Sequence, residues 1–324
     1  MAKRIVFFNN KGGVGKTTLV YHIAYKLLDL GYKVLLADFD PQCNLTAMFL
    51  PTERLEEIYV EKMPCTVTDA IQPVFDGSAY EGVHVESTDD GANDMNLIMG
   101  NLLLSSHEDE LSEAWTNCLA SRVDAFKKTM IFDTILTDAE QKTTADFTLI
   151  DVAPSLGGIN RAVLIATDYI VLPVASDLFS LQGIENLGRT IRAWRTAWSE
   201  RISKRPERLG QILAKGIMSP IGYVVLQHTA RESRPVKAYL NWSNKIPDAY
   251  RKYVLNMQDA DDISIDFSKD EFCIGALKHY HSLMPMAMQA HKPMFRLKPA
   301  DGAIGAHFQA AKKVGADFEK LVYA

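Results

Sequence analysis

Short apolar runs alternate along this chain with stretches of helical periodicity. The runs are four to six residues long and nearly continuous in apolar character, which is typical of strands buried on both faces of a parallel sheet. Between the first two runs, Leu19, Ile23, Leu27 and Leu30 recur at helical spacing and share one face. We therefore expect an α/β chain, with strands at 5–8, 33–37, 96–99, 146–151, 169–173 and 221–226.

The remaining segments predict helices of different kinds. Residues 51–93 are acidic and rich in turn formers, so we expect a surface excursion there, with short helices at 53–59 and 67–71. An interrupted surface helix is expected from 106 to about 132, and a packed helix from about 303 to 321. No repeat or linker interrupts the chain, so one domain over 1–324 is the simplest interpretation. The helix that begins at Gly183 should face the core with Ile184, Leu187, Ile191, Trp194 and Trp198.

The first strand leads directly into a glycine-rich loop. Strand, loop and helix N-terminus in this order form a phosphate cradle, because backbone N–H groups and the helix dipole converge on an anion. Lys16 supplies a positive charge for the outer phosphates of a nucleotide, and the Thr17 hydroxyl suits Mg²⁺. The ordinary pattern G-x-x-x-x-G-K-[ST] nevertheless fails, since Asn10 stands in place of its first glycine and Lys11 follows. The loop residues are Lys11, Gly12, Gly13, Val14, Gly15, Lys16, Thr17 and Thr18.

Two further strands are predicted to end in aspartates. Asp38 and Asp40 follow the strand at 33–37, at the edge where open parallel sheets bind their ligands. Asp40 could then reach a metal-bound nucleotide or its attacking water, although a pair of turn-capping aspartates is the plainer interpretation of this motif alone. Asp151 ends the strand at 146–151 in the Walker B manner, in which the carboxylate holds Mg²⁺ directly or through water.

Composition excludes several classes of protein. With 47% hydrophobic and 23% charged residues, the chain is neither disordered nor embedded in a membrane, and no apolar run reaches the ~20 residues that span a bilayer. The four cysteines lack C-x-x-C spacing, so we expect no disulfide and no metal cluster. Because the first strand begins close to Met1, we expect neither a signal peptide nor a helix-turn-helix ahead of the loop, and a cytoplasmic location.

The net charge of −5 conceals two segments of opposite sign. From Glu53 to Glu113 there are fifteen Asp or Glu against two basic residues. From Arg189 to Lys215 there are eight Lys or Arg against two Glu. The first segment could bind a basic partner and the second a polyanion. For either segment alone, a charged surface that only contacts solvent is the plainer interpretation.

Three motifs occur together and in a fixed order: K-G-G-x-G-K-T-T at 11–18, D-x-D-P-Q at 38–42 and D-x-x-P-S-L at 151–156. In this combination the chain resembles the ParA-type partition ATPases, members of the ParA/MinD group with a deviant Walker A loop, over most of its length. The resemblance implies a P-loop NTPase fold, in which a parallel twisted sheet is flanked by helices on both faces. It also implies ATP and Mg²⁺ as cofactors, and a homodimer that encloses ATP at its interface.

The same resemblance implies roles for individual residues. Lys11 would reach across the dimer to the partner's phosphates, whereas Lys16 would bind phosphate in its own subunit. Thr17 and, through water, Asp151 would hold Mg²⁺, and Asp40 would orient or activate the hydrolytic water. Hydrolysis then removes the contact on which tight dimerisation depends, so the nucleotide acts as a slow, partner-stimulated association switch.

Proteins of this type bind DNA non-specifically as ATP dimers and position plasmids, chromosomes or other cargoes, including protein clusters. Such phosphate contacts need no sequence motif, and binding should fall steeply with salt. Association with the nucleoid would follow in the ATP-bound state, and a ParB-like activator with a basic segment would suit the acidic stretch at 53–113. The expected DNA-binding residues are Arg189, Arg192, Arg195, Lys204, Arg205 and Arg208, with Arg231, Arg234 and Lys237 as weaker candidates.

Two other classes within the group are less well supported. A membrane-associated, MinD-like division-site or cargo-positioning ATPase needs a basic amphipathic C-terminal helix, and the segment 303–321 lacks a strong basic face. A redox or metal-delivery ATPase needs paired cysteines, and Cys118 has none near it in the sequence. The sequence does not determine the adenine-binding residues, for which Gln227 and the segment 285–287 are candidates by position only.

Overall fold

The computed structural model describes residues 2–88, 94–210, 214–228, 241–257, 265–280 and 282–323. Within these ranges eight strands form one sheet, in the order β3-β4-β2-β5-β1-β6-β7-β8. All neighbouring strands run parallel except β3 and β4. The strands are β1 (Lys3–Phe7), β2 (Val34–Phe39), β3 (Glu86–Ser87), β4 (Met95–Ile98), β5 (Phe147–Val152), β6 (Tyr169–Ala175), β7 (Ser219–His228) and β8 (Cys273–Lys278).

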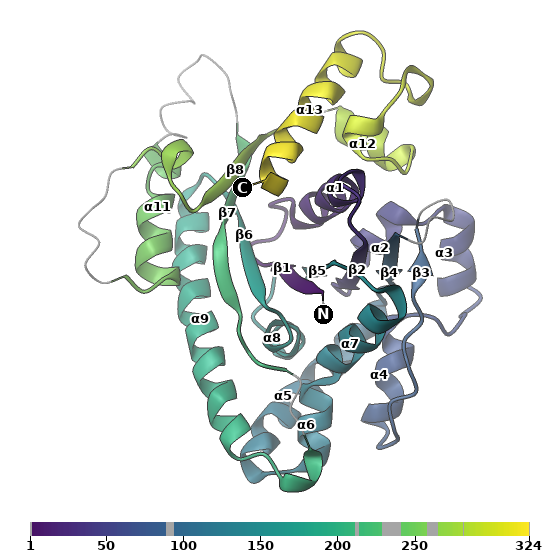
Figure 1. The fold of residues 1–324 in the computed structure, drawn as a ribbon, viewed down its shortest axis with the longest axis vertical. Helices are drawn as coiled ribbons and strands as arrows, with labels where there is room; N and C mark the ends of the chain where they lie inside the picture. The colour runs from purple at the N-terminus through teal and green to yellow at the C-terminus, as the bar shows by residue number, and fades with distance from the viewer. Residues whose placement is uncertain are drawn as a thin grey trace.

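Helices cover both faces of this sheet, as Figure 1 shows, so the expected fold class is confirmed. One face carries α1 (Lys16–Asp29), α2 (Asn44–Phe49), α3 (Thr52–Tyr59), α12 (Leu283–Gln289) and α13 (Ala306–Tyr323). The other face carries α4 (Val67–Phe75), α5 (Glu108–Asn117), α6 (Val123–Thr129), α7 (Ile131–Thr143), α8 (Gly158–Ile165), α9 (Leu178–Ser203) and α11 (Ile246–Ala249). Shorter turns are η1 (Leu102–His107), η2 (Cys118–Ala120), η3 (Glu207–Leu209), η4 (Tyr250–Val254), η5 (Phe267–Lys269), η6 (Met294–Arg296) and η7 (Pro299–Asp301). Over the described ranges, none of the helices has the length and apolar character that crossing a membrane requires.

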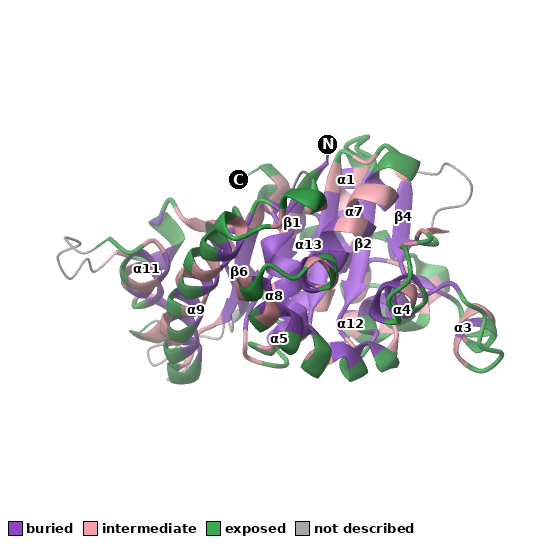
Figure 2. Ribbon diagram, turned by 90° about the horizontal axis from the view of Figure 1, so that it is seen from below, coloured by how far each residue is buried: buried purple, intermediate pink, exposed green. Residues whose placement is uncertain are grey.

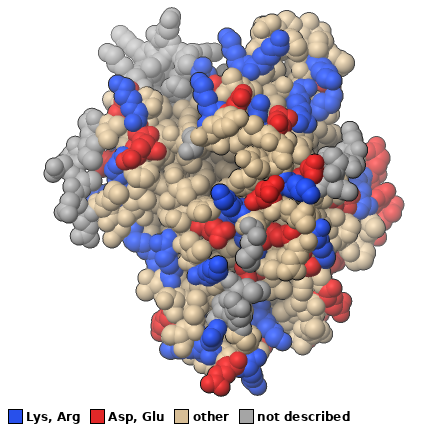
Figure 3. Space-filling model, viewed as in Figure 1, with Lys and Arg blue, Asp and Glu red and all other residues tan. Residues whose placement is uncertain are grey.

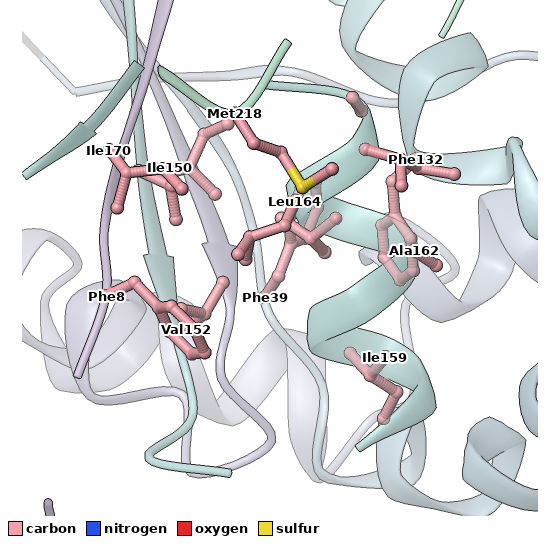
Figure 4. Packing of buried hydrophobic residues seen from close by; sticks show 14 of the residues in the cluster. Phe8, Phe39, Phe132, Ile150, Val152, Ile159, Ala162, Leu164, Ile170 and Met218 are labelled. Carbon is pink, nitrogen blue, oxygen red and sulfur yellow. The ribbon is translucent and has the colours of Figure 1, made fainter. Parts of the chain in front are cut away.

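Two hydrophobic cores fill the space between the sheet and its helices, and the strands at the centre of Figure 2 are mostly buried. Successive residues of a strand point to opposite faces, so Leu35 of β2 enters one core and Leu36 the other. Figure 4 shows part of the core that contains Leu35, which also includes Ile150 of β5, Phe39 and Phe132. The ring centroids of Phe39 and Phe132 lie 4.8 Å apart. Burial on both faces explains why these strands are continuous apolar runs in the sequence.

The structure corrects several predicted elements. Two strands were not predicted: β3 has only two residues, and β8 has Gly275 in the middle of its apolar residues. The interrupted helix expected over 106–132 is confirmed as the separate segments α5, η2 and α6, but α7 then continues beyond the expected end to Thr143. Helix α9 begins before Gly183, at Leu178, since the Asp177 side chain caps it by accepting the N–H of Ser180. The helices at 53–59 and 67–71 are present as α3 and α4.

The sheet brings the carboxyl ends of β1, β2 and β5 to one edge. Strand β5 lies between the other two, and Asp151 is in register with Phe7 of β1 and with Asp38 of β2. Neighbouring strands are about 4.8 Å apart, so the residues that follow these three strands must lie close together. The glycine-rich loop and both aspartate motifs therefore open onto the same place.

Candidate nucleotide-binding site

The glycine-rich loop connects β1 to α1 through a backbone that favours glycine. Gly13 and Gly15 have φ angles of +70° and +92°, in the left-handed region where a side chain is strained. Gly15 is also the N-cap of α1, so it offers no side chain that could cap the helix. The first N–H groups of α1 are therefore available to an anion, as a phosphate cradle requires.

Thr17 and Asp151, the residues predicted to hold Mg²⁺, lie in contact with each other. The Thr17 hydroxyl donates to Asp151 Oδ2 over 2.6 Å. Asp151 is fully buried, and its Oδ1 has no hydrogen-bond partner among the residues that the structure describes. An unsatisfied buried carboxylate oxygen beside a hydroxyl is an oxygen donor set of the kind that Mg²⁺ takes, so these residues fit the ion. Burial, with Asp38 close by, raises the pKa of Asp151 to about 8.

The two aspartates after β2 have different surroundings. Asp38 is buried and accepts the backbone N–H and the hydroxyl of Thr46, over 2.8 and 2.7 Å, which ties the end of β2 to α2. Burial raises the pKa of Asp38 to about 7. Asp40 instead lines the cavity beside the loop, and its Oδ1 accepts the N–H of Gln42 over 2.9 Å. Asp38 is therefore the turn-stabilising residue, and Asp40 is placed to act on a ligand.

Lys16 lies between these carboxylates at the start of α1. The Lys16 side chain is buried, and this burial lowers its pKa. The nearby Asp151 and Asp40 raise the pKa of Lys16 but do not offset the effect of burial. A lysine with little water around it and acidic neighbours loses little solvation when it binds a phosphate.

A cavity of about 540 Å³ joins these groups. Besides the loop, Asp40 and Gln42, it is lined by Pro154 after β5 and by Met284 and Met288 of α12. A smaller apolar hollow of about 120 Å³ adjoins it. Sequence reasoning missed both methionines, although their i, i+4 spacing on one helical face was a usable signal. The predicted neighbours at 285–287 do not line the cavity, and the side chain of Gln227 lies outside the described part of the chain.

Lys11 does not line this cavity. Its Nζ instead pairs with Asp177 Oδ2 over 2.5 Å, at the N-terminus of α9. Its backbone N–H donates to Asn9 Oδ1 over 2.9 Å, and Asn9 Nδ2 donates to the carbonyl of Pro173 in β6. The start of the loop is therefore held to the β6–α9 connection, a contact that no sequence pattern indicated.

The basic residues predicted on and after α9 fall into two groups. Arg192 and Arg195 are half-buried and donate to the backbone carbonyls of Tyr253 and Met218, which lie far away in the sequence. The other members of the set are exposed, and in Figure 3 Lys and Arg side chains gather at the lower left, on the side where α9 runs in Figure 1. Arg231, Arg234 and Lys237 lie outside the described residues. The exposed members are Arg189, Lys204, Arg205 and Arg208.

Comparison with known proteins places this chain in a family. A family model described as AAA domain matches residues 2–204, which contain the loop, Asp40 and Asp151. Over 192 residues the chain is 32% identical to the chromosome-partitioning ATPase Soj of Treponema pallidum, across 59% of this chain and 64% of that protein. The matched stretch therefore spans less than two thirds of the length of this curated relative.

Two solved structures are similar over most of the chain. Protein DIP2308 from Corynebacterium diphtheriae has a TM-score of 0.67 at 25% identity, over 89% of this chain and 97% of that one. A plasmid partition protein from Borrelia burgdorferi, bound to AMPPNP, has a TM-score of 0.56 at 17% identity, over 98% and 99%, and shows the likeness of fold alone. The family match, the partition relative and the site geometry agree: the chain belongs to the AAA-domain family and, within it, to the ParA-type partition ATPases.

Proposed function

We propose that this protein is a Mg²⁺-dependent ATPase that dimerises on ATP, binds DNA non-specifically as the dimer, and positions a plasmid, a chromosome or another cargo. The observation that carries the proposal is that Lys16, Thr17 and Asp40 line one cavity beside the glycine-rich loop, with the buried Asp151 bonded to Thr17 behind it. The match to a chromosome-partitioning ATPase supports the cargo-positioning role.

The cavity offers separate places for the parts of ATP. The phosphates would lie against the N–H groups from Gly13 to Thr18, where α1 begins, with Lys16 on the outer phosphates. The adjoining apolar hollow would take the base, since it is bounded by Leu226, Leu277 and Phe318 and opens beside Gly15 and Thr18.

Thr17 and Asp151 are the residues that would hold Mg²⁺, with Asp151 acting through water. The bound ion supplies positive charge that offsets the phosphates and the charge that develops on them during transfer. Both residues have the capacity for this, because Thr17 has its hydroxyl at the cavity and Asp151 Oδ1 is unpaired within the described structure.

Asp40 would orient the attacking water. As the bond between the water oxygen and the γ-phosphorus forms, the bond from that phosphorus to the β–γ bridging oxygen breaks, and Asp40 accepts the proton that the water releases. Its Oδ1 is held by Gln42, which fixes the direction of the carboxylate. Lys16 stabilises the phosphate oxygens, and the products are ADP and phosphate.

A second copy of the chain would bind at the edge of the sheet where the parallel strands end. Exposed apolar side chains follow three strands that alternate with β2 and β1 in the sheet: Leu103 after β4, Leu156 after β5 and Phe179 after β6. Phe179 is 70% exposed and Leu103 is 67% exposed. Apolar groups that surround a ligand site in this way are typical of an interaction surface. A partner that covers them would bring its own Lys11 toward the phosphates.

DNA would bind the exposed basic residues at and after the end of α9, where Lys204, Arg205 and Arg208 follow each other closely. The acidic side chains exposed along α3, Glu53, Glu56 and Glu57, would suit the basic segment of an activator. Both contacts are electrostatic and exposed, so both should weaken as salt increases.

Binding to a random-sequence duplex tests the proposal. We expect tight binding with ATP and weak binding with ADP or without nucleotide, across a salt series from about 50 to 200 mM. Lys16→Ala should abolish the ATP effect. Arg205→Glu with Arg208→Glu should weaken DNA binding and leave ATP affinity unchanged. Lys62→Glu, a charge reversal in the acidic segment, is the control and should leave DNA binding unchanged. Equal DNA binding with and without ATP would refute the proposed function.

A further inference from the structure

We propose that Asp177 is a positioning residue that acts as a gate on Lys11: its carboxylate holds this lysine in the free chain and gives it up to the phosphates of a partner subunit. The inference rests on the ATP-dependent dimer proposed above. It adds the residue that sets how readily that dimer forms.

The geometry shows a lysine that is held away from its own nucleotide site. Lys11 Nζ lies 2.5 Å from Asp177 Oδ2, and Lys11 is not among the residues that line the cavity beside Lys16. Two further contacts fix the place where this lysine begins. Its own N–H is bonded to Asn9, and Asn10 Oδ1 lies 3.1 Å from where a Cβ at Gly183 of α9 would be. The lysine thus emerges directly against the first turns of α9.

The ion pair between Lys11 and Asp177 is weak enough for a phosphate group to replace Asp177 as the partner of the lysine. The Lys11 and Asp177 side chains are 33% and 37% exposed, so water screens their attraction. Exposed pairs of this kind shift an equilibrium by about 1.4- to 5-fold. The phosphates of ATP present more negative charge than one carboxylate, and they do so at a site that is shielded from water once two subunits meet. Phosphate should therefore displace Asp177 in the dimer and not before.

Asp177 also occupies the position at which a partner would arrive. Its Oδ1 accepts the N–H of Ser180 over 2.9 Å, so the same carboxylate that holds Lys11 through one oxygen caps α9 through the other. Burial raises the pKa of Asp177, but the bonds from Lys11 and Ser180 outweigh burial and leave that pKa below its ordinary value. The next two residues, Leu178 and Phe179, are exposed and apolar. Release of Lys11 and burial of this apolar pair would thus occur at the same turn.

The substitution Asp177→Asn separates the two roles of this residue. Asparagine caps a helix about as well as aspartate, so α9 keeps its N-cap while the charge that holds Lys11 is lost. Each dimer releases two lysines, so the dimer dissociation constant changes by the square of the factor for one ion pair. The ATP-dependent dimer dissociation constant, measured by analytical ultracentrifugation, should fall by about 2- to 25-fold. Asp177→Glu restores the charge and should return the constant toward that of the wild type.

The second arm places Asp177→Asn in a Lys11→Met background, which has no lysine to release. There dimerisation with ATP should be weak, and Asp177→Asn should not tighten it at any protein concentration used, whereas a role limited to α9 would tighten dimerisation in both backgrounds. A variant Asp177→Asn that dimerises no more tightly than the wild type would overturn the gate and leave the proposed function standing. A wild-type chain that stays monomeric with ATP would overturn the proposed function itself.

Discussion

His22 joins the phosphate-binding helix to the C-terminal part of the chain, and replacing it with glutamine should change how stability depends on pH. Its Nε2 accepts the N–H of Met294 over 3.1 Å, so its Nδ1 carries the proton and donates to the Thr18 carbonyl over 2.7 Å. The ring also stacks on Phe318 of α13, with centroids 4.8 Å apart. The side chain is fully buried, and burial lowers the pKa of His22 to about 4.

The sign and size of the effect follow from this pKa. The unfolded chain takes up a proton at His22 below about pH 6.5, whereas the folded chain stays neutral down to about pH 4. The unfolded state therefore binds more protons between these values, and stability falls as the pH falls. From about pH 7.5 to about pH 5, His22 should lower the free energy of unfolding by about 2 kcal/mol. Asp38 and Asp151, with raised pKa values, act in the opposite direction, so only a difference between variants isolates His22.

Urea unfolding at a series of pH values, followed by circular dichroism, measures that difference. Near pH 7.5, His22→Gln should be less stable than the wild type by about 1–3 kcal/mol, because it loses packing and buried hydrogen bonds. By about pH 5 the difference should shrink by about 2 kcal/mol, since glutamine does not titrate. Phe318→Leu is the matched control: it loosens the same packing but keeps the histidine, so its stability should run parallel to that of the wild type. A difference between wild type and His22→Gln that stays constant with pH would refute a buried neutral His22.

Three further predictions concern the site and the fold. Asp40→Ala should retain ATP binding but not hydrolysis, so ATP dimers should accumulate in light scattering; a monomer would contradict the proposed interface. Asp151→Asn should weaken Mg²⁺-dependent nucleotide binding by about 10- to 100-fold in calorimetric titrations, and an unchanged affinity would remove Asp151 from the metal site. Gly188→Ala should destabilise the protein to urea by about 1–3 kcal/mol, because a Cβ there would collide with the backbone carbonyl of Tyr253; full stability would mean that α9 can shift away from η4.

The elements that could be predicted from the sequence are those whose own residues show a clear pattern. A strand buried on both faces must be apolar throughout, so β2 and β5 are evident from their residues alone. In the described sheet, strand β8 is an edge strand beside β7, and Gly275 interrupts its short apolar run, so the run did not stand out as a strand. Two residues, as in β3, are too few for any pattern.

The same distinction applies to the site. The phosphate loop, Asp40 and Asp151 were predictable because each follows a recognisable strand, and parallel strands end at a common edge. The residues that were missed come from distant segments that only the folded chain brings together, as α12 brings Met284 to the cavity. A helical wheel likewise places Arg192 on the outer face, but it cannot show that η4 packs there and offers a carbonyl to it.

The charges at this edge of the sheet argue that one chain is not enough. Asp40 and Asp151 act on the buried Lys16, and burial raises the pKa of Asp38 and of Asp151 although Lys16 acts against the shift at Asp151. ATP adds about four negative charges, and even with two of these offset by a magnesium ion the site stays strongly negative. Another lysine is needed, yet Lys11 is directed to Asp177 and away from its own cavity. In the proposed ATP dimer, the lysine that completes the site comes from a second copy, which would make association depend on the phosphates that hydrolysis removes.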